Sequence, residues 1–299
     1  MTFCFFSAQY LPTPGGVERY TWNLARRCGA AGHRALIVTS ALPGLPARER
    51  DPDGLEIWRL PVFPVMGGRF PVLRPLPPAA DLWAQHIDFA VIQTRMYTQS
   101  IWAARQCKRR GIPALVIDHS TGYMMHGGLG GLLGRWYEHL ACGVIRRCGF
   151  PFYGVSGDVC RWLRTFGITA AGTLPNAVDP EELAVLAKKD PCTDWRQTLQ
   201  VPADGHLVVF VGRLIPEKGG LRLATAVQQL PGCVLAVAGT GPEEDALRRM
   251  GGTIHVLGAL PHPQIVQLLS QADCYCLPTE YAEGFPTTLL EAAACRCPI

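Results

Sequence analysis

Two cations lie close together in a glycine-rich stretch of this 299-residue chain. The segment "GRLIPEKGG" places Arg213 and Lys218 five positions apart, directly after the apolar run "HLVVFV" and before a helical pattern. Cations at the end of a buried strand are costly unless water or an anion meets them. A diphosphate would satisfy both, because arginine binds phosphate in a fork and lysine binds it as a point charge. The alternative is a solvated loop in which Glu217 pairs with one of them.

Two carboxylates follow near the end of the chain, in "TEYAEGFPTTLLEAAACRCPI". Glu283 precedes the turn signal "GFP", and we expect its side chain to point into a binding cleft. Glu291 comes eight positions later, inside a predicted helix. Thr288 and Glu291 also match the capping box S/T-x-x-E, in which the glutamate bonds back to the threonine amide. Glu291 therefore has both a ligand-binding and a capping interpretation.

Glycine-rich turns could bring the backbone close to a phosphate at two further places. Gly15 and Gly16 open a predicted helix whose first amides would be available to an anion, although a purely structural turn fits equally well. Gly239 and Gly241 form a tight loop at another helix start, but Pro242 follows directly, so the dinucleotide pattern G-x-G-x-x-G fails. The run "GGLGGLLG" does not directly follow a strand, and no G-x-x-x-x-G-K-[ST] motif occurs.

No metal site is predicted. The only D-x-D sequence, Asp51-Pro-Asp53, precedes Gly54 and is typical of a turn. The twelve cysteines include two C-x-C pairs, whereas structural zinc sites usually carry C-x-x-C. Because the chain is long, lacks a secretion signal and places cysteines in apolar contexts, we predict reduced, buried thiols.

Strand-like and helix-like segments alternate along the chain. Apolar runs such as "TFCFF" and "LVIDH" are separated by helical patterns, and the same holds for "HLVVFV" and "CVLAVA" further on. This alternation predicts an α/β fold with parallel sheets covered by helices on both faces. We predict two Rossmann-like, doubly wound domains, residues 1–172 and 173–299, that face a cleft. Ligands of such folds bind at the carboxyl ends of the strands.

Two segments fit this alternation less simply. Six prolines within residues 61–78 disfavour a helix or a central strand, so we predict a long ordered loop or lid. The segment "GGLLGRWYEHLACGVIRRCG" carries apolar residues at helical spacing, and we expect this stripe to face the core. The alternative is a helix that lies on a membrane surface. These apolar residues are Leu132, Leu133, Trp136, Leu140 and Val144.

Charge is distributed unevenly between the two predicted domains. Residues 1–172 hold 19 Lys and Arg against 10 Asp and Glu, a net charge of +9, and residues 173–299 hold 9 against 14, a net charge of −5. The first domain could meet an anionic surface or substrate, although ordinary variation in surface charge has the same result. Nucleic acid is not expected as a partner, because no binding motif appears. Without a basic leader or an apolar run of about 18 residues, we expect a cytoplasmic protein, with peripheral inner-membrane contact through the basic domain as an option.

Five motifs, in order along the whole chain, resemble the retaining nucleotide-sugar glycosyltransferases of the GT-B fold, family 4. They are "PGGVERYTWNLARRCGAAGH", "LPNAVD", "VGRLIPEKG", "AGTGPEEDAL" and "EGFPTTLLEAAA". The resemblance implies that Arg213 and Lys218 bind the donor diphosphate, that Glu291 holds the ribose hydroxyls and that Glu283 faces the donor sugar. It also implies that Gly16 lies against the phosphate and that His119 contacts the donor sugar.

The site residues implied in this way form two overlapping sets. The catalytic set is Glu283, His119, Arg213 and Lys218. The donor-binding set is Gly15, Gly16, Arg213, Lys218, Gly241, Pro242, Glu283, Gly284, Phe285, Thr287, Thr288 and Glu291. Asn176 and Asp179 match the linker motif, which we interpret as mainly structural.

The chain departs from the family pattern in three respects. Pro286 removes an N–H group that could meet phosphate, so the loop must donate from Thr287 or Thr288. Arg296 stands where the family usually has the helix C′ glycine. Members of the family also continue beyond "CPI" with further strand–helix units. We therefore expect the second domain to be incomplete and the chain to be part of a longer product.

The resemblance predicts retaining transfer of a sugar, most simply a hexose, from a UDP- or GDP-linked donor to a glycan or lipid-linked acceptor of cell-envelope polysaccharide synthesis. Preorganised cations would stabilise the charge that develops on the departing diphosphate, so neither a metal nor another cofactor is expected. Two alternatives remain: a nucleotide-sugar-binding fragment without turnover, and a nucleotide-sugar epimerase of the same fold.

Overall fold

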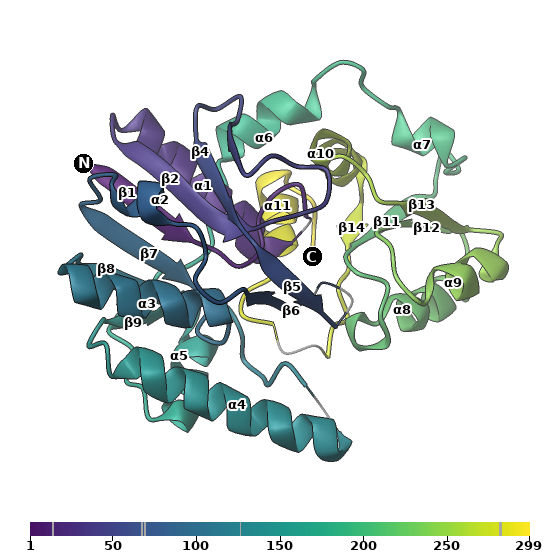
Figure 1. The fold of residues 1–299 in the computed structure, drawn as a ribbon. Coiled ribbons are helices and arrows are strands. Elements are labelled where there is room, and N and C mark those ends of the chain that lie inside the picture. Colours follow the sequence, from purple (N-terminus) through teal and green to yellow (C-terminus); the bar gives the residue numbers. More distant parts are fainter. Residues whose placement is uncertain (14, 67, 69, 126, 281–282) are drawn as a thin grey trace. The chain divides into compact units, whose positions relative to one another are not determined.

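The chain folds into two compact α/β units in a computed structural model that describes residues 1–13, 15–66, 68, 70–125, 127–280 and 283–299 (Figure 1). The first unit contains Met1–Asn176 and residues 283–285. The second unit contains the rest of the described chain from Ala177 onward. The division therefore falls at residue 176 rather than at the predicted 172, and a short segment near the C-terminus belongs with the first unit.

A mostly parallel sheet forms the centre of the first unit. Its described strands are β1 (Thr2–Phe6), β2 (Arg34–Ser40), β3 (Arg48–Arg50), β4 (Glu56–Leu60), β7 (Phe89–Gln93), β8 (Ala114–Asp118), β9 (Phe152–Gly154) and β10 (Gly172–Thr173). They lie in the order β10-β9-β8-β7-β1-β2-β4-β3, and only β3 pairs antiparallel. The order runs outward in both directions from β1 and β7, which creates the switch point where ligands of doubly wound sheets bind.

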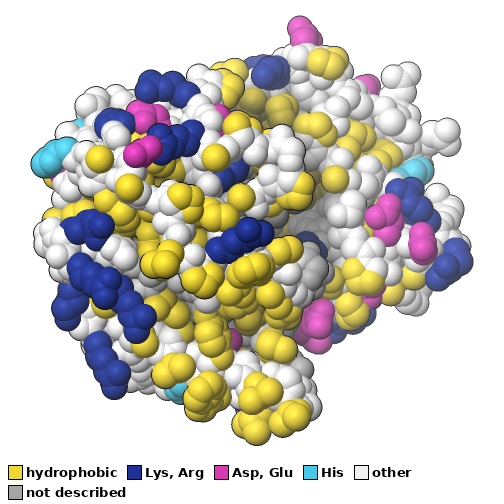
Figure 2. Space-filling model, in the orientation of Figure 1, with side chains coloured by type: hydrophobic (Ala, Val, Ile, Leu, Met, Phe, Trp, Pro, Cys, Tyr) yellow, Lys and Arg dark blue, Asp and Glu magenta, His cyan; other side chains and the backbone are white. Residues whose placement is uncertain are grey.

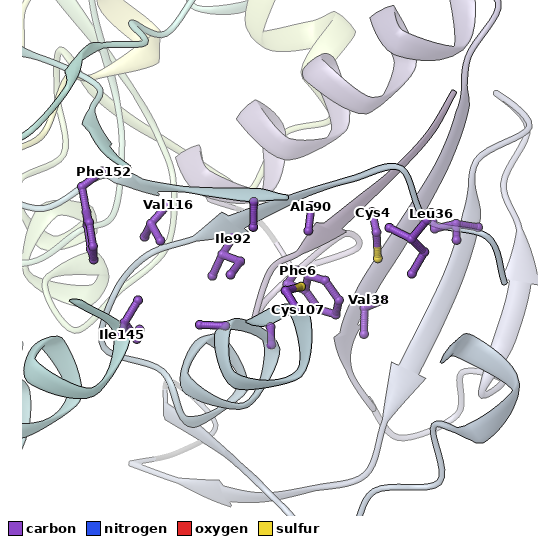
Figure 3. Close-up of a cluster of buried hydrophobic side chains, with 14 of the residues drawn as sticks. Cys4, Phe6, Leu36, Val38, Ala90, Ile92, Cys107, Val116, Ile145 and Phe152 are labelled. Atoms are coloured by element: carbon purple, nitrogen blue, oxygen red, sulfur yellow. The ribbon is translucent and has the colours of Figure 1, made fainter. Parts of the chain in front are cut away.

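Helices cover both faces of this sheet, which explains why its central strands are nearly continuous apolar runs. Successive residues of one strand point to opposite faces: Phe6 belongs to the core on one face and Phe5 to the core on the other. The helices are α1 (Gly16–Ala30), α2 (Ala80–Trp83), α3 (Thr98–Arg110), α4 (Gly128–Arg146) and α5 (Gly157–Leu163), followed by the 3₁₀ turn η1 (Arg164–Phe166). Figure 3 shows the core on the α3 and α4 side, with Cys4, Phe6, Leu36, Val38, Ala90, Ile92, Cys107, Val116, Ile145 and Phe152 labelled.

The proline-rich segment is a β-hairpin, so the predicted loop was wrong. Strand β5 (Val62–Val65) pairs antiparallel with β6 (Phe70–Leu73), and Pro64 lies opposite Pro71. A proline fits an antiparallel ladder only where its missing N–H would point away from the partner strand. The Arg74 amide donates to the Pro61 carbonyl at 3.0 Å, and opposite pairs alternate along the ladder between hydrogen-bonded and non-hydrogen-bonded. In this register Pro64 and Pro71 form a non-hydrogen-bonded pair, so neither strand loses a ladder bond.

Helix α4 is correctly located by its periodicity, but the predicted direction of its apolar stripe was wrong. Leu132, Leu133, Trp136 and Leu140 are exposed, and Val144 is half-buried. The buried face is the opposite one, made mainly of small residues together with one glutamate and one isoleucine. This face comprises Gly131, Gly134, Glu138, Ala141, Cys142 and Ile145.

Helix α1 buries Glu18, Thr21 and Ala25, whereas Val17, Tyr20 and Leu24 are half-buried. All twelve cysteines are free thiols, as predicted, but only four of them are buried and Cys192 is exposed. Among the described residues, every helix is too short or too polar to cross a membrane.

The second unit is built around a parallel sheet in the order β13-β12-β11-β14. Its described strands are β11 (His206–Val211), β12 (Cys233–Ala238), β13 (Ile254–Gly258) and β14 (Cys274–Tyr275). All three strand pairs are parallel. Its helices are α6 (Pro180–Ala187), α7 (Trp195–Thr198), α8 (Gly220–Val227), α9 (Glu244–Met250), α10 (His262–Gln271) and α11 (Thr287–Ala294), with the 3₁₀ turn η2 (Pro216–Lys218).

Candidate functional site

The loops that follow β11 and β12 are joined by backbone hydrogen bonds. The Leu214 amide donates to the Thr240 carbonyl at 2.9 Å, and the Glu243 amide donates to the Leu214 carbonyl at 3.1 Å. The contact depends on glycine at 239, where φ is 145° and an added Cβ would lie 1.8 Å from the Gly212 carbonyl oxygen. The two glycine-containing loops singled out in the sequence therefore form one rigid edge at the carboxyl ends of two neighbouring strands.

The two predicted phosphate-binding cations lie on this edge. Arg213 follows β11 by two residues and is exposed, and Lys218 ends the turn η2 and is half-buried. The loop that follows β14 is attached to the same turn, because the Glu280 amide donates to the Glu217 carbonyl at 2.7 Å. Gly241 and Pro242 belong to the β12 loop, so the structure brings these four predicted donor-binding residues to one end of the sheet.

A cavity of about 330 Å³ lies beside this turn, but its charge does not suit a diphosphate. Three of its lining residues, Glu217, Glu243 and Glu280, carry carboxyl groups, and Glu280 pairs with Arg222, the one lining cation. Burial and the nearby Glu217 raise the pKa of Glu243. The remaining lining residues are Pro216, Gly219 and Leu221.

Helix α11 places Glu291 against a histidine, and the capping-box interpretation of this glutamate is wrong. Pro286 occupies the N-cap position, so Thr288 already lies inside the helix, where its Oγ1 accepts from the Tyr275 hydroxyl at 2.6 Å. Glu291 is buried, and its Oε1 lies 2.9 Å from Nε2 of His262 at the start of α10. Because α10 follows β13, this pair lies at the same end of the sheet as the cations.

The first turn of α11 begins at Thr287 and Thr288, the two predicted donors after Pro286. Proline at the N-cap costs the helix nothing, since that N–H is not used within the helix. Thr287 and Thr288 then supply the first helical amides, which carry the positive end of the helix dipole. This geometry agrees with the expected effect of Pro286.

In the first unit, His119 lies directly after β8 and contacts side chains from two other elements. Its Nε2 lies 2.8 Å from Oε1 of Gln93, the last residue of β7, and the Tyr20 ring of α1 packs edge-on at 5.0 Å. Burial lowers the pKa of His119 from 6.5 to about 3. The imidazole is therefore neutral at physiological pH, and can hydrogen bond as donor or acceptor without carrying charge.

A buried ionic cluster holds the chain around His119. Arg95 follows β7 and is fully buried, with its guanidinium paired to Asp118 and, at 3.0 Å, to Glu138 of α4. Asp118 also accepts from the His119 amide at 3.0 Å, and Glu138 accepts from the Met124 amide at 2.8 Å. Burial raises the pKa of Glu138. The cluster thus fixes both ends of the segment that carries His119.

The segment from Glu283 to Phe285 is held against the same part of the chain. Glu283 pairs with Ser120 through an antiparallel bridge, and its carbonyl accepts from Thr121 Oγ1 at 3.1 Å. An added Cβ at Gly284 would lie 2.0 Å from the His119 carbonyl oxygen, so only glycine fits there. The structure therefore brings Glu283, Gly284 and His119 together within the first unit.

The Gly15–Gly16 turn opens α1 as predicted, but a carboxylate of the chain already lies over it. An added Cβ at Gly15 would lie 2.0 Å from Oε2 of Glu18, which is buried in the first turn of α1. A carboxylate at this end of a helix is stabilised by the helix dipole. A phosphate that approached Gly16 would therefore meet the Glu18 carboxylate at the same position.

Structural roles predicted for other motifs agree with the geometry. Asp51 accepts from the Leu55 amide at 2.8 Å, which closes the expected turn. Asp179 caps α6 by accepting from the amide of Glu181, and Asn176 donates to the Phe285 carbonyl at 2.7 Å. Within the described ranges, no group of three or more His, Cys, Asp or Glu side chains is placed to hold a metal ion.

Several residues at these sites were missed in the sequence. Gln93 had a usable signal, because it is a polar residue at the carboxyl end of an apolar strand. Tyr20 lies inside helix α1 and gave no signal that its ring would pack against a histidine 99 positions away. His262 and the Arg95–Glu138 pair gave no local signal, since their partners are 29 and 43 positions away.

Comparison with known proteins identifies the family. The family model described as "Glycosyltransferase Family 4" matches residues 14–182, more than half of the chain, and "Glycosyl transferases group 1" matches residues 192–299. The chain is 40% identical over 105 residues to a putative teichuronic acid biosynthesis glycosyltransferase, TuaC, of Bacillus subtilis, covering 35% of this chain and 26% of that protein. It is 24% identical over 314 residues to the phosphatidylinositol N-acetylglucosaminyltransferase GPI3 subunit of Saccharomyces cerevisiae, covering 96% of this chain and 64% of the relative. The chain thus spans less than two thirds of the length of these relatives.

Solved structures show the same fold. Anabaena Alr3699/HepE in complex with UDP-glucose superposes with a TM-score of 0.71 at 19% identity, covering 100% of this chain and 79% of that one. WaaG, a glycosyltransferase involved in lipopolysaccharide biosynthesis, superposes with a TM-score of 0.67 at 18% identity, covering 99% and 80%. The fold is therefore GT-B, in agreement with the α/β prediction. Together with the match over more than half of the sequence, this shows that the chain belongs to glycosyltransferase family 4.

Proposed function

We propose that this chain binds a nucleoside-diphosphate sugar and transfers the sugar, with retention of configuration, to a glycan or glycolipid acceptor. The observation that carries the proposal is the edge formed by the β11 and β12 loops, which presents Arg213 and Lys218 from a backbone that is already fixed. Preorganised cations stabilise a departing diphosphate at no reorganisation cost, which is the condition for effective electrostatic catalysis.

The remaining site residues receive roles that their surroundings support. Arg213 and Lys218 bind the diphosphate, the amides of Thr287 and Thr288 add donors at the start of α11, and Glu291 accepts from the ribose hydroxyls. His262 orients Glu291 through their 2.9 Å contact. The Gly241–Pro242 loop lies beside the phosphates.

In the first unit, the neutral His119 and the carboxylate of Glu283 act on the donor sugar. As the bond from the anomeric carbon to the diphosphate breaks, positive charge develops on the sugar, and Glu283 stabilises it. The electron pair leaves with the diphosphate, where Arg213 and Lys218 offset the new negative charge. Because two cations serve the leaving group, we propose that the reaction needs no metal.

The class of product is proposed from the relatives. One is named for teichuronic acid biosynthesis and another for N-acetylglucosaminyl transfer to phosphatidylinositol. A structural neighbour was solved with UDP-glucose. We therefore propose a UDP- or GDP-linked hexose donor and a cell-envelope glycan or lipid-linked acceptor.

Calorimetric titration with UDP and GDP tests the donor site directly. Arg213→Ala and Lys218→Ala should each weaken binding at least about tenfold, because a charge-assisted bond to phosphate contributes roughly 1.5–3 kcal/mol. Arg249→Ala is the matched control: Arg249 is an exposed arginine of the same unit, on α9. Unchanged affinity in both site variants would refute the assignment.

Product analysis then separates the alternatives. Release of UDP or GDP together with a sugar or glycoside of retained anomeric configuration supports the transferase. Conversion of the donor into its epimer would show the epimerase, and binding without turnover would show a donor-binding fragment.

A further inference from the structure

The exposed face of α4 is a continuous apolar stripe. Leu129, Leu132, Leu133, Trp136 and Leu140 recur every three or four residues and are all more than half exposed. One turn of helix is 3.6 residues, so these side chains lie on one side of the helix, along a line that Arg147 continues. Such a stripe on a helix normally faces a core.

The core does not need this stripe, because the opposite face of α4 already packs. Gly134 and Ala141 let the helix approach the first unit closely, and Ile145 enters the core cluster. Glu138 is buried through its pairing with Arg95. The inner face of α4 is therefore already packed against the first unit. Large apolar side chains on its outer face indicate an interaction with another molecule.

Exposed cations outnumber exposed carboxylates in the part of the chain that carries the stripe, and the carboxylate that follows it, Asp158 of α5, is exposed but pairs with Arg161. Between residues 89 and 157 the sequence contains only two acidic residues, Asp118 and Glu138, and both are fully buried in the Arg95 cluster. The same segment carries exposed cations on α3 and α4 and directly after α4. These are Arg105, Lys108, Arg109, Arg110, Arg135, Arg146 and Arg147.

These cations lie beside the stripe and have neutral neighbours. Lys108 donates to the Arg147 carbonyl at 2.6 Å, which joins the last turn of α3 to the C-terminal end of α4. Arg146 donates to the Gly167 carbonyl, and Arg110 bonds to the amide group of Gln106. None of these three contacts offsets the positive charge of the cation that makes it.

The hairpin β5–β6 adds to the same surface. Phe70 of β6 packs edge-on against Tyr137 of α4 at 5.7 Å, and Phe63 and Val65 of β5 are exposed. Figure 2 shows apolar side chains over both the hairpin and α4, and a row of basic side chains along the edge where Figure 1 draws α3. Apolar groups bordered by uncompensated cations form one composite face of the first unit.

We propose that this face docks on the surface of an anionic phospholipid bilayer, with the α4 stripe inserted among the acyl chains and the α3–α4 cations at the headgroup phosphates. An apolar face with Leu and Trp, bordered by Lys and Arg, is the pattern of helices that lie in a membrane interface. A second copy of the chain fits less well, because it would offer the same cations and no exposed carboxylate from this segment. The inference goes beyond the proposed transfer reaction and does not depend on it.

Co-sedimentation of the full chain with vesicles tests the proposal. We expect binding to vesicles that contain phosphatidylglycerol, weaker binding to pure phosphatidylcholine, and loss of binding at high salt. Leu133→Ser combined with Trp136→Ser should reduce partitioning about tenfold or more, because two apolar side chains no longer insert. Arg109→Glu combined with Arg147→Glu should have a similar effect through the charge.

The matched control is Leu230→Ser, a substitution of a leucine in the second unit that is 53% exposed, close to the 58% of Leu133. It should leave partitioning unchanged. Insertion has its own readout, because all seven tryptophans are described and only Trp136 is exposed. Phosphatidylglycerol with brominated acyl chains should therefore quench part of the tryptophan emission, and Trp136→Phe should abolish that quenching.

Three results would overturn the inference. They are equal binding to charged and uncharged vesicles, unchanged binding of both double variants, and a lipid-free dimer in sedimentation equilibrium that the stripe variant dissociates. The last would assign the face to a second copy of the chain. None of these assays contains donor, so a failure of donor binding or transfer would be recognised separately.

Discussion

Replacing Arg95 by methionine should destabilise the first unit far more than an average substitution. The guanidinium is fully buried between Asp118 and Glu138, donates to Ser120 Oγ at 2.8 Å and lies 4.3 Å from the centre of the Phe166 ring. Methionine fills much of the space but leaves two carboxylates facing each other without a cation. Removing one partner of a buried ion pair costs about 3–5 kcal/mol. That is a large part of the roughly 5–15 kcal/mol that holds a domain together.

The loss of folding stability in Arg95→Met should depend on pH. Its direction follows from the carboxylates that the substitution leaves without a cation. Burial already raises the pKa of Glu138 in the folded wild type, and removing the Arg95 charge raises it further above that of the unfolded chain. A group whose folded pKa is raised contributes stability that is present at low pH and is lost as pH rises through that pKa. The difference in unfolding free energy between Arg95→Met and the wild type should therefore shrink on acidification.

Urea unfolding followed by tryptophan emission measures this unit, because six of the seven tryptophans lie before residue 177. Arg105→Met is the matched control, since Arg105 is an exposed arginine of the neighbouring helix and should change stability by less than about 0.5 kcal/mol. Adding Glu138→Gln to Arg95→Met should restore part of the loss. A loss below about 1 kcal/mol, or one that does not vary with pH, would refute the reasoning.

Two further substitutions test single features of each unit. Because burial lowers the pKa of His119 to about 3, the unfolded chain binds one more proton below pH ~6.5, and the wild type should lose about 1.4 kcal/mol of stability per pH unit relative to His119→Gln. Parallel stability profiles of the two proteins between about pH 7 and pH 5 would contradict this. Arg296 has a φ of 59° just after α11, so Arg296→Gly should slow hydrogen exchange of the α11 amides, by an amount that corresponds to about 0.5–1 kcal/mol. Arg296→Ala keeps a Cβ in that conformation and should leave the exchange rates near the wild-type values.

The strands were predictable because of where they lie. A parallel strand covered by helices on both faces needs apolar side chains in both directions, so it stands out as a continuous apolar run. The carboxyl end of one such run then pointed to Arg213 and Lys218 in the sequence, whereas His119 was implied by the family resemblance. Strand β14 is the exception, because it consists of only two residues, Cys274 and Tyr275.

The errors concern features that periodicity cannot separate. Helical spacing shows that Leu133 and Trp136 share a face of α4, but it cannot show which face packs when the opposite one is made of glycine, alanine and a paired glutamate. The number of prolines disfavoured strands in the segment that forms the hairpin. That number carries no information on strand register, and it is the register that allows Pro64 to lie opposite Pro71. The capping box at Thr288 failed for a similar reason, because Pro286 and not Thr288 precedes the helix.

Arg95 and Arg213 show why the candidate site was only partly readable. Each arginine follows a parallel strand by two residues, β7 and β11 respectively. Only Arg213 was singled out in the sequence, because Lys218 follows it in a glycine-rich stretch. Arg95 is buried because Glu138, 43 positions away, and Asp118 supply its countercharge, whereas Arg213 is exposed. Physical chemistry then assigns them different consequences: Arg95→Met should unfold the first unit at lower urea while Arg213→Met leaves unfolding unchanged and weakens nucleotide binding. If both variants affected only stability, Arg213 would be a structural residue, and the diphosphate site proposed on the β11–β12 edge would lose its main support.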